Sequence, residues 1–447
     1  MYREVSNLLL YSDLPQDSIL LRLAGIFEEW EIGDCGREAL VKRIYKEVKR
    51  LLDLATKYGF DHNLWQNYLT FLLITNENSF SLTCERAGAG SGSVNHFAKS
   101  DFKVFQALFH FDFGSLERDL GIDCFSVLTD YTAIPKQERR YNKSISEKVQ
   151  RLSLDLAQAR DEAELFQHIT GFYRDFGVGM FGLNRAFRIR NQEGTVLFSP
   201  VSNSDTIRLE DLIGYDNQKR QLISNTEAFV DGRSANNVLL YGDSGTGKSS
   251  SVKALINEYY DRGLRMIELY KHQFRDLSAV IAQIKNRNYR FILFIDDLSF
   301  EENEIEYKFL KAVIEGGVET KPDNILIYAT SNRRHLIRES WSDRNDMEYD
   351  DEIHRSDTME EKLSLSSRFG ILINYSTPDR KDFFRIVDSL AARQKITGLS
   401  EEQLHAQAVK WELRHGGVSG RTAQQFINYL AAETASLPSI ESTVGLP

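Results

Sequence analysis

The chain is poor in cysteine and proline, with three cysteines and seven prolines among 447 residues. Cys35, Cys84 and Cys124 are odd in number, lie far apart and form no Cys-x-x-Cys pair. This spacing argues against a disulfide framework and against a zinc site. It is typical of reduced thiols in a cytoplasmic protein, so we expect a cytoplasmic location.

Long apolar runs are also missing, because no run approaches the ~18–20 residues that a membrane span requires. The first residues, MYREVSNLLLYSDLPQDS, lack the basic region and long apolar core of a signal peptide. The composition, with 42% hydrophobic and 27% charged residues, is that of a soluble globular protein. We therefore expect no membrane as a partner, and the length predicts two or three domains.

Positive charge is not in excess, since the formal net charge is −10. This balance argues against a protein whose whole surface binds nucleic acid. Much of the negative charge is local, because residues 341–362 hold nine acids and three bases. The segment 136–151 and the arginines 333, 334 and 338 are basic and could contact phosphates, but a charge run is more often a solvated face. The sequence therefore neither excludes nor supports nucleic acid as a partner.

The first half of the chain has the apolar spacing of helices. Apolar residues recur every three or four positions in 16–31 and 37–55, and further helices are predicted over 63–74 and 145–169. A short hairpin is predicted over 186–201, with its turn at residues 192–194. We place the boundary in the Ser/Asn-rich segment 199–205, so that residues 1–204 form a mainly α-helical N-terminal domain that carries partner choice or regulation.

Short apolar runs alternate with helical segments after residue 205. This alternation predicts a parallel sheet with helices on both faces, an α/β core over 205–377. The runs stop at Pro378, and residues 378–433 are predicted to form a helical lid, followed by a tail over 434–447. The predicted strands are 237–242, 264–269, 291–296, 324–330 and 370–376.

A glycine-rich motif, YGDSGTGKSS, lies directly after one predicted strand and directly before a helix. It has the pattern G-x-x-x-x-G-K-S, in which glycines let backbone N–H groups wrap around phosphate oxygens. Lys248 would contact the outer phosphates and the Ser249 hydroxyl would ligate Mg²⁺. A flexible Gly/Ser turn is the plain alternative, and the flanking strand and helix argue against it. The residues predicted to bind the nucleotide here are Gly242, Asp243, Ser244, Gly245, Thr246, Gly247, Lys248, Ser249 and Ser250.

Two adjacent aspartates, Asp296 and Asp297, end the apolar run RFILFI. Uncompensated charge at the edge of a core is costly, so a cation is expected beside them. In P-loop proteins a carboxylate at the end of a neighbouring strand holds Mg²⁺. We therefore predict that Ser249 and Asp296 hold the metal and that Asp297 faces the γ-phosphate and an attacking water.

Three further residues are weaker candidates. Asn332 follows the run 324–330 and is placed to orient water or the γ-phosphate, although a strand followed by a turn is the plain interpretation. Arg368, just before the last predicted strand, could reach a phosphate in a neighbouring subunit, although most such arginines only make surface ion pairs. Arg421 lies at the first turn of a late helix, where a solvated arginine is the plain interpretation.

These pieces in this order resemble the AAA+ ATPases over roughly residues 205–433. The strings YRFILFIDDLSFE, PDNILIYATSNRRHL and LSSRFG are closer still to a bacterial AAA+ family catalogued as a domain of unknown function, and they are distantly similar to replication initiators and helicase loaders. The resemblance implies bound ATP and Mg²⁺ and a homo-oligomer. It further implies the following residue roles: Ile213, Gly214 and Tyr215 border adenine, Asn332 is sensor 1, Arg368 is the arginine finger and Arg421 is sensor 2.

One residue departs from the family pattern, because most AAA+ proteins have glutamate where this chain has Asp297. The aspartate carboxylate is one methylene shorter and reaches less far toward a lytic water, with Glu301 or Glu302 as potential substitutes. The sequence is compatible with three functions. The first is an ATPase that remodels a macromolecule, the second a slow nucleotide-gated switch or loader that tethers a protein or nucleic acid, and the third, less favoured, a small-molecule kinase.

Overall fold

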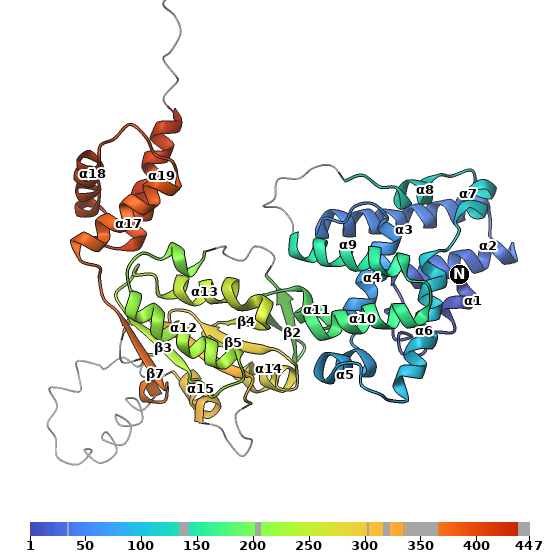
Figure 1. The fold of residues 1–447 in the computed structure, drawn as a ribbon, viewed down its shortest axis with the longest axis horizontal. Helices are drawn as coiled ribbons and strands as arrows, with labels where there is room; N and C mark the ends of the chain where they lie inside the picture. The colour runs from blue at the N-terminus through green and yellow to red at the C-terminus, as the bar shows by residue number, and fades with distance from the viewer. Residues whose placement is uncertain are drawn as a thin grey trace, which may run out of the picture. The chain divides into compact units, whose positions relative to one another are not determined.

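The computed structural model describes residues 1–33, 35–133, 143–201, 207–301, 304–315, 322–333, 336 and 365–436. The chain divides into two compact units (Figure 1). The N-terminal unit comprises Met1–Arg185 with Pro200–Ser204, and the C-terminal unit comprises Ala186–Ser199 with Asp205–Pro447. Each unit has its own core and is described separately below.

The N-terminal unit is mainly helical within its described residues, as the sequence predicts. Its helices are α1 (Tyr2–Val5), α2 (Ile19–Ile32), α3 (Arg37–Tyr58), α4 (Leu64–Thr75), α5 (Ser79–Ala87), α6 (Val94–Phe109), α7 (Gly114–Leu120), α8 (Cys124–Thr129), α9 (Lys143–Gln158), α10 (Glu162–Phe176) and α11 (Gly179–Leu183).

The single helix predicted over 145–169 is wrong, because the structure has two helices there. Helix α9 ends at Gln158 and α10 begins at Glu162. The Asp161 carboxylate accepts hydrogen bonds from the backbone N–H groups of Ala163 (3.0 Å) and Glu164 (2.9 Å). An aspartate in this position caps the start of a helix, so it begins a second helix.

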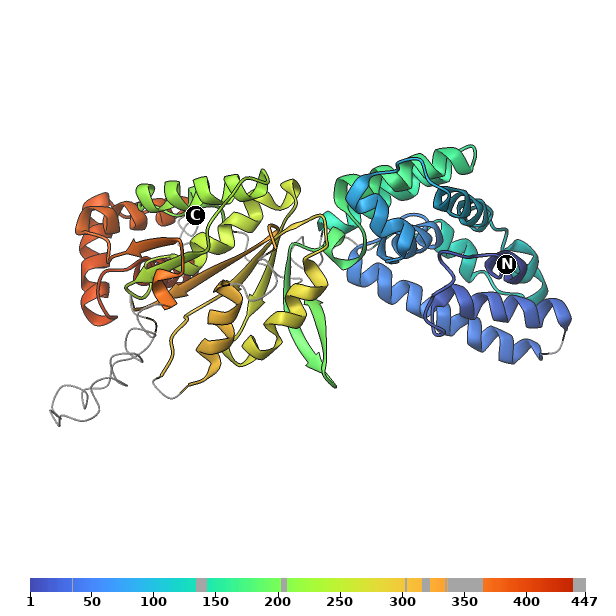
Figure 2. The same cartoon turned by 90° about the horizontal axis from the view of Figure 1, so that it is seen from below.

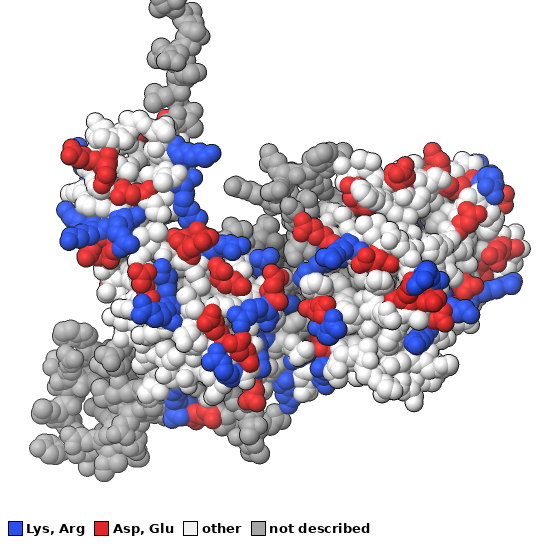
Figure 3. Space-filling model, in the orientation of Figure 1, with Lys and Arg blue, Asp and Glu red and all other residues white. Residues whose placement is uncertain are grey.

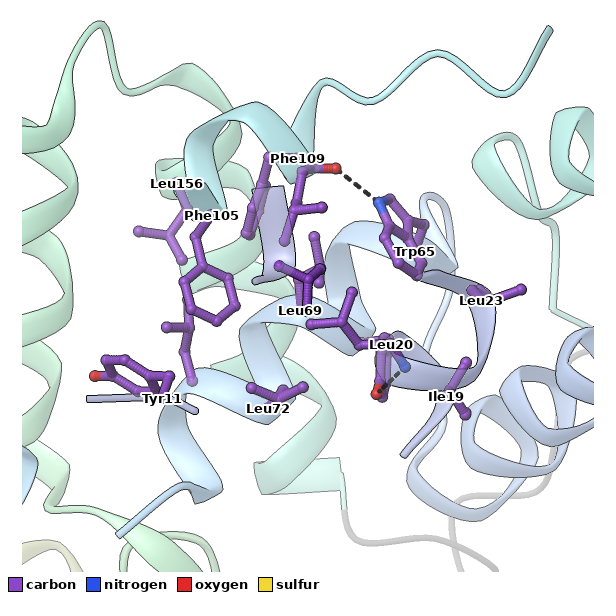
Figure 4. Close-up of a cluster of buried hydrophobic side chains, with 14 of the residues drawn as sticks. Tyr11, Ile19, Leu20, Leu23, Trp65, Leu69, Leu72, Phe105, Phe109 and Leu156 are labelled. Carbon is purple, nitrogen blue, oxygen red and sulfur yellow. Dashed lines mark hydrogen bonds between the residues drawn. The ribbon is translucent and has the colours of Figure 1, made fainter. Parts of the chain in front are cut away.

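Buried aromatic and leucine side chains fill the centre of the N-terminal unit (Figure 4). Trp65 on α4 donates from Nε1 to the Leu108 carbonyl at 2.8 Å, so its polar atom is satisfied inside the core. The Tyr68 hydroxyl accepts the Leu20 N–H at 3.0 Å. These bonds tie α4 to α6 and α2 and make the unit one packed body.

The C-terminal unit is built on a sheet that has seven strands within the described residues, in the order β2-β1-β4-β5-β6-β3-β7. The neighbouring pairs β1–β4, β4–β5, β5–β6, β6–β3 and β3–β7 are all parallel. The strands are β1 (Ala186–Gln192), β2 (Thr195–Pro200), β3 (Val238–Gly242), β4 (Leu264–Leu269), β5 (Arg290–Ile295), β6 (Ile325–Ser331) and β7 (Ile371–Tyr375). The five strands predicted after residue 205 are thereby confirmed.

The hairpin of β1 and β2 extends this sheet, although the sequence placed it before the domain boundary. Strand β1 pairs with β4, with Phe187 opposite Ile267. The turn residues Glu193 and Gly194 both have positive φ, 51° and 84°, as a two-residue hairpin turn requires. Phe187 of β1 is buried. Because β1 pairs with β4, it belongs to the C-terminal unit.

Helices cover both faces of the sheet (Figure 2). Helices α12 (Asp216–Val230) and α13 (Lys248–Tyr259) lie on one face, where Phe229 and Leu255 pack against Leu240 and Phe294. Helices α14 (Leu277–Ile284) and α15 (Glu306–Glu315) lie on the other. Because the strands are parallel, the segments that follow β3, β5 and β6 all emerge at one edge of the sheet. Where this unit is described, its short 3-10 helices are η2 (Leu209–Asp211), η3 (Tyr260–Arg262) and η4 (Lys271–Asp276).

The helical lid is formed by α17 (Arg380–Arg393), α18 (Glu401–Arg414) and α19 (Gly420–Ser436), as predicted. It has its own small core, in which Phe383 and Val387 of α17 pack with Phe426 and Ile427 of α19. Among the described residues no helix combines the length and the apolar character needed to cross a membrane.

Candidate nucleotide-binding site

A cavity of about 740 Å³ lies where the carboxyl edge of the sheet meets the lid. It is lined by the glycine-rich loop, by the ends of β5 and β6, by the segment before α12 and by residues of α17 and α19. The predicted residues that line it are Ile213, Tyr215, Ser244, Gly245, Thr246, Gly247, Lys248, Ser249, Ser250, Asp296, Asp297, Asn332 and Arg421. Gly214, Gly242, Asp243 and Arg368 do not line it.

All three glycines of the loop, Gly242, Gly245 and Gly247, have backbone conformations that other residues rarely adopt. Gly247 has φ 94° and lies directly before α13, so the loop turns into the helix there. Gly242 has φ 132°, and a Cβ on it would lie 2.2 Å from the Tyr375 carbonyl oxygen. Because Gly242 has no Cβ, the start of the loop can pass close to the backbone of β7.

Lys248 is buried at the start of α13 and is held by three oxygen atoms. Its Nζ donates to the carbonyls of Gly242 (2.9 Å) and Asp243 (2.6 Å) and to Asn332 Oδ1 (3.1 Å). Burial lowers the pKa of Lys248, and the nearby carboxylates of Asp243, Asp297 and Asp296 oppose that shift. A bound polyphosphate would favour the charged ammonium further, so this position suits an anionic ligand.

The structure brings the two predicted metal ligands together. The Ser249 hydroxyl donates to Asp296 Oδ1 at 2.5 Å. A serine hydroxyl and a carboxylate are oxygen donors of the type that Mg²⁺ takes at phosphate sites, where one or two protein ligands suffice. The donor set therefore fits a magnesium ion that also contacts a nucleotide.

Asp297 has a left-handed backbone conformation and lines the cavity at the carboxyl end of β5. Its φ is 52°, which an aspartate tolerates better than most residues. Asp297 Oδ1 accepts a hydrogen bond from Asn332 Nδ2 at 2.8 Å, and Asn332 Oδ1 in turn accepts from Lys248. Lys248, Asn332 and Asp297 thus form a hydrogen-bonded row at the cavity wall.

The segment predicted to border adenine forms the apolar end of the cavity. Ile213 and Tyr215 lie there with Ile386 and Leu390 of the lid. Tyr215 has φ 57°, its ring stacks on Tyr375 at 4.9 Å, and burial raises its pKa to about 12. Apolar side chains opposite a tyrosine are suited to a flat aromatic base.

The two predicted arginines lie in different environments. Arg421 lines the cavity from α19, and its backbone N–H donates to the Gly245 carbonyl at 3.3 Å. Arg368 forms an ion pair with Glu315 at the end of α15. Within one chain, therefore, Arg421 is at the site and Arg368 is not among its lining residues.

The other candidates have simple outcomes. Glu301 is exposed and is not among the residues that line the cavity. Glu302, Arg334, Arg338, residues 136–142 and the acidic segment 341–362 lie outside the described residues.

Three contacts of the site were not predicted from the sequence. Thr330 of β6 hydrogen-bonds both aspartates, Arg393 of the lid pairs with Asp211 at 2.7 Å, and Asp243 Oδ2 accepts from the Thr377 N–H (2.8 Å) and hydroxyl (2.7 Å). The strand order could have suggested Thr330, because β6 ends beside Asp296. The other two join residues far apart in the chain and have no local signal.

Replacing Asp243 by alanine should loosen the segment that joins β7 to the lid, because Thr377 loses both of its hydrogen bonds to Asp243 Oδ2. We expect amide exchange around Thr377 to rise roughly fivefold, as for the loss of one net hydrogen bond. The Thr377 hydrogen bonds lower the pKa of Asp243. Its stabilising effect is therefore present at neutral pH and lost only as the pH falls below about 4.

The matched control for that variant is Asp323→Ala, which removes an exposed carboxylate next to the amino end of β6. Hydrogen exchange followed by mass spectrometry compares both variants with the unchanged protein. Equal exchange around Thr377 in all three proteins would show that Asp243 does not hold this segment.

Comparison with known families supplies a classification. The model of a family described as "Protein of unknown function (DUF815)" matches residues 183–434, more than half of the chain. The chain belongs to this family. The parallel sheet, the glycine-rich loop between β3 and α13 and the helical lid give it the AAA+ fold that the sequence predicted.

Solved structures of the RuvB Holliday junction branch migration motor of Thermotoga maritima are similar to the chain over part of its length. One RuvB structure is 18% identical with a TM-score of 0.35, and a structure of a RuvB point mutant is 18% identical with a TM-score of 0.36. Each match covers 49% of this chain and 63% of the RuvB chain. No curated protein matches this member of the DUF815 family.

Proposed function

We propose that the chain binds Mg·ATP in this cavity and hydrolyses it to drive a conformational change in a macromolecular partner. The observation that carries the proposal is the convergence of Lys248, Ser249 and Asp296 in a cavity that the lid residue Arg421 also lines. A cation and a pair of metal ligands beside the cavity are parts that phosphoryl transfer uses, since catalysis there is mainly positioning and charge stabilisation.

Each side chain has a distinct role in this proposal. The N–H groups of the loop and Lys248 bind the phosphates, while the apolar end of the cavity holds the base. Ser249 and Asp296 hold Mg²⁺, which neutralises charge on the phosphates when bound. Asp297 accepts a proton from the attacking water, and Asn332 keeps its carboxylate directed along the cavity wall.

Nucleotide occupancy would be transmitted to the lid through contacts that span the cavity. Arg421 reaches the glycine-rich loop from α19, and Arg393 reaches Asp211 from α17. Asp243 links the loop itself to Thr377, directly before the lid. A change in the position of the loop would therefore act on both ends of the lid.

Arg368 is proposed to complete the site of a neighbouring subunit in a homo-oligomer. Its position off the cavity of its own chain supports a role in trans. Specific phosphate release should then rise with protein concentration, and Arg368→Ala should lower it by about 10³-fold or more at saturating ATP. The test measures steady-state phosphate release over a wide range of protein concentration.

A mixture of Arg368→Ala and Lys248→Ala chains provides the control, because each lacks a different half of a shared site. Mixing two inactive variants should restore part of the activity if the sites lie between subunits. Activity that is independent of concentration and unchanged by Arg368→Ala would contradict the role in trans.

A slow, nucleotide-gated switch is the second candidate, and the shorter side chain of Asp297 favours it. Asp297 Oδ1 is engaged by Asn332 in this structure, which leaves less freedom to reach a water. Such a switch would bind ATP tightly and release phosphate at a rate near zero at every protein concentration. It would tether its partner in the ATP-bound form.

The partner is proposed to bind the helical N-terminal unit. On the face shown in Figure 3, lysine and arginine side chains are interspersed with aspartate and glutamate over the described surface. This mixture gives no support to a nucleic acid partner, which would favour a clustered basic surface. A protein partner is therefore the proposal.

A further inference from the structure

Thr330, at the carboxyl end of β6, makes two hydrogen bonds with the acidic pair through one hydroxyl group. The hydroxyl donates to Asp296 Oδ1 at 2.6 Å and accepts the backbone N–H of Asp297 at 2.9 Å. Thr330 is 2% exposed, although it lines the cavity, so its hydroxyl is held almost entirely by protein atoms. The parallel register of β5 and β6, with Ile295 opposite Ala329, places this hydroxyl beside Asp296.

The two bonds act on the two aspartates in different ways. The bond to Asp296 fixes a carboxylate oxygen that also accepts from Ser249, so Asp296 stays on the side of the glycine-rich loop. The bond to the Asp297 N–H anchors the peptide at the point where the chain turns left-handed, with φ 52° at Asp297. That turn directs the Asp297 carboxylate to Asn332 instead of Ser249.

We propose that Thr330 is a positioning residue that separates the tasks of the two aspartates. It holds Asp296 for the metal and Asp297 for the lytic water. The inference rests on the proposed ATPase function but assigns a residue that neither the motif nor the family classification identifies. Two adjacent carboxylates repel each other and have the same chemistry, so their separate roles require an external constraint. A donor and an acceptor on one buried hydroxyl provide that constraint.

The test replaces Thr330 by valine, which keeps the branched shape and removes both bonds, and by serine, which keeps the hydroxyl. In Thr330→Val we expect kcat for phosphate release to fall by about tenfold or more, because the base is misplaced, while the affinity for ATP in EDTA stays nearly unchanged, because the metal-independent nucleotide contacts remain. Thr330→Ser should restore most of the rate. The matched control is Thr226→Val, which removes another buried threonine hydroxyl of the same unit, bonded to Leu222 and Tyr328.

Two readouts remain when no phosphate release is detected in the unchanged protein, an outcome that would defeat the hydrolysis proposal alone. The first is the ratio of ATP affinities with Mg²⁺ and with EDTA, which Thr330→Val should reduce by releasing Asp296. The second is a nucleotide-free crystal structure of Thr330→Val, in which Asp297 should leave the left-handed conformation and lose its bond to Asn332. An unmoved Asp297 in that structure, or a Thr330→Ser variant as impaired as Thr330→Val, would overturn the inference.

Discussion

Replacing Lys248 by alanine is expected to abolish phosphate release and to weaken ATP binding by about 10²-fold or more. Lys248 is the one cation of the glycine-rich loop, and its ammonium lies between the loop carbonyls and Asn332. The substitution leaves the γ-phosphate without this charge and frees one end of the Lys248–Asn332–Asp297 row. Measured together, binding by calorimetry and phosphate release would both show the loss.

The variant must remain folded for this result to be informative. Lys253→Ala is the matched control, because Lys253 lies on the same helix α13 and does not line the cavity. Both variants should melt cooperatively near the unchanged protein, and Lys253→Ala should keep its activity. A folded Lys248→Ala protein with retained turnover would remove the ATPase account.

Replacing Asp297 by asparagine is expected to separate binding from hydrolysis. Asparagine tolerates the left-handed backbone of this position and keeps the side-chain size. It cannot accept a proton from water, so phosphate release should fall by about 10²–10⁴-fold while the affinity for ATP stays close to that of the unchanged protein. Single-turnover phosphate release and equilibrium ATP binding measure the two effects.

Asp297→Glu is the companion variant, because it lengthens the side chain by one methylene and restores the residue that most AAA+ proteins have. If the short side chain limits the reaction, the glutamate variant should hydrolyse ATP faster. Equal rates in the asparagine variant and the unchanged protein would show that Asp297 is not the base. Rates near zero in both proteins would favour the slow switch.

The chemistry of the site was predictable because its residues lie in local patterns. The strand–loop–helix around Lys248 and the aspartates after β5 are each recognisable within about ten residues, and the structure joins them through the Ser249–Asp296 bond. The central parallel strands β5 and β6 were predictable for the same reason, since each is a short apolar run buried on both faces.

Contacts between distant segments could not be predicted in this way. Asp243 meets Thr377 across 134 positions, and Asp211 meets Arg393 across 182. The edge position of β1 depends on its pairing with β4, which no property of residues 186–192 specifies. The break before Asp161 was missed because the apolar spacing continues through it, although the aspartate itself is a helix-start signal.

Titration of the full chain with ATP, in Mg²⁺ and in EDTA, tests the central claim most directly. The account predicts one site per chain, tighter binding with Mg²⁺, and loss of the magnesium effect in Ser249→Ala and Asp296→Asn, whose side chains meet at 2.5 Å. Absence of binding at millimolar ATP, or binding that ignores both Mg²⁺ and Lys248→Ala, would contradict it.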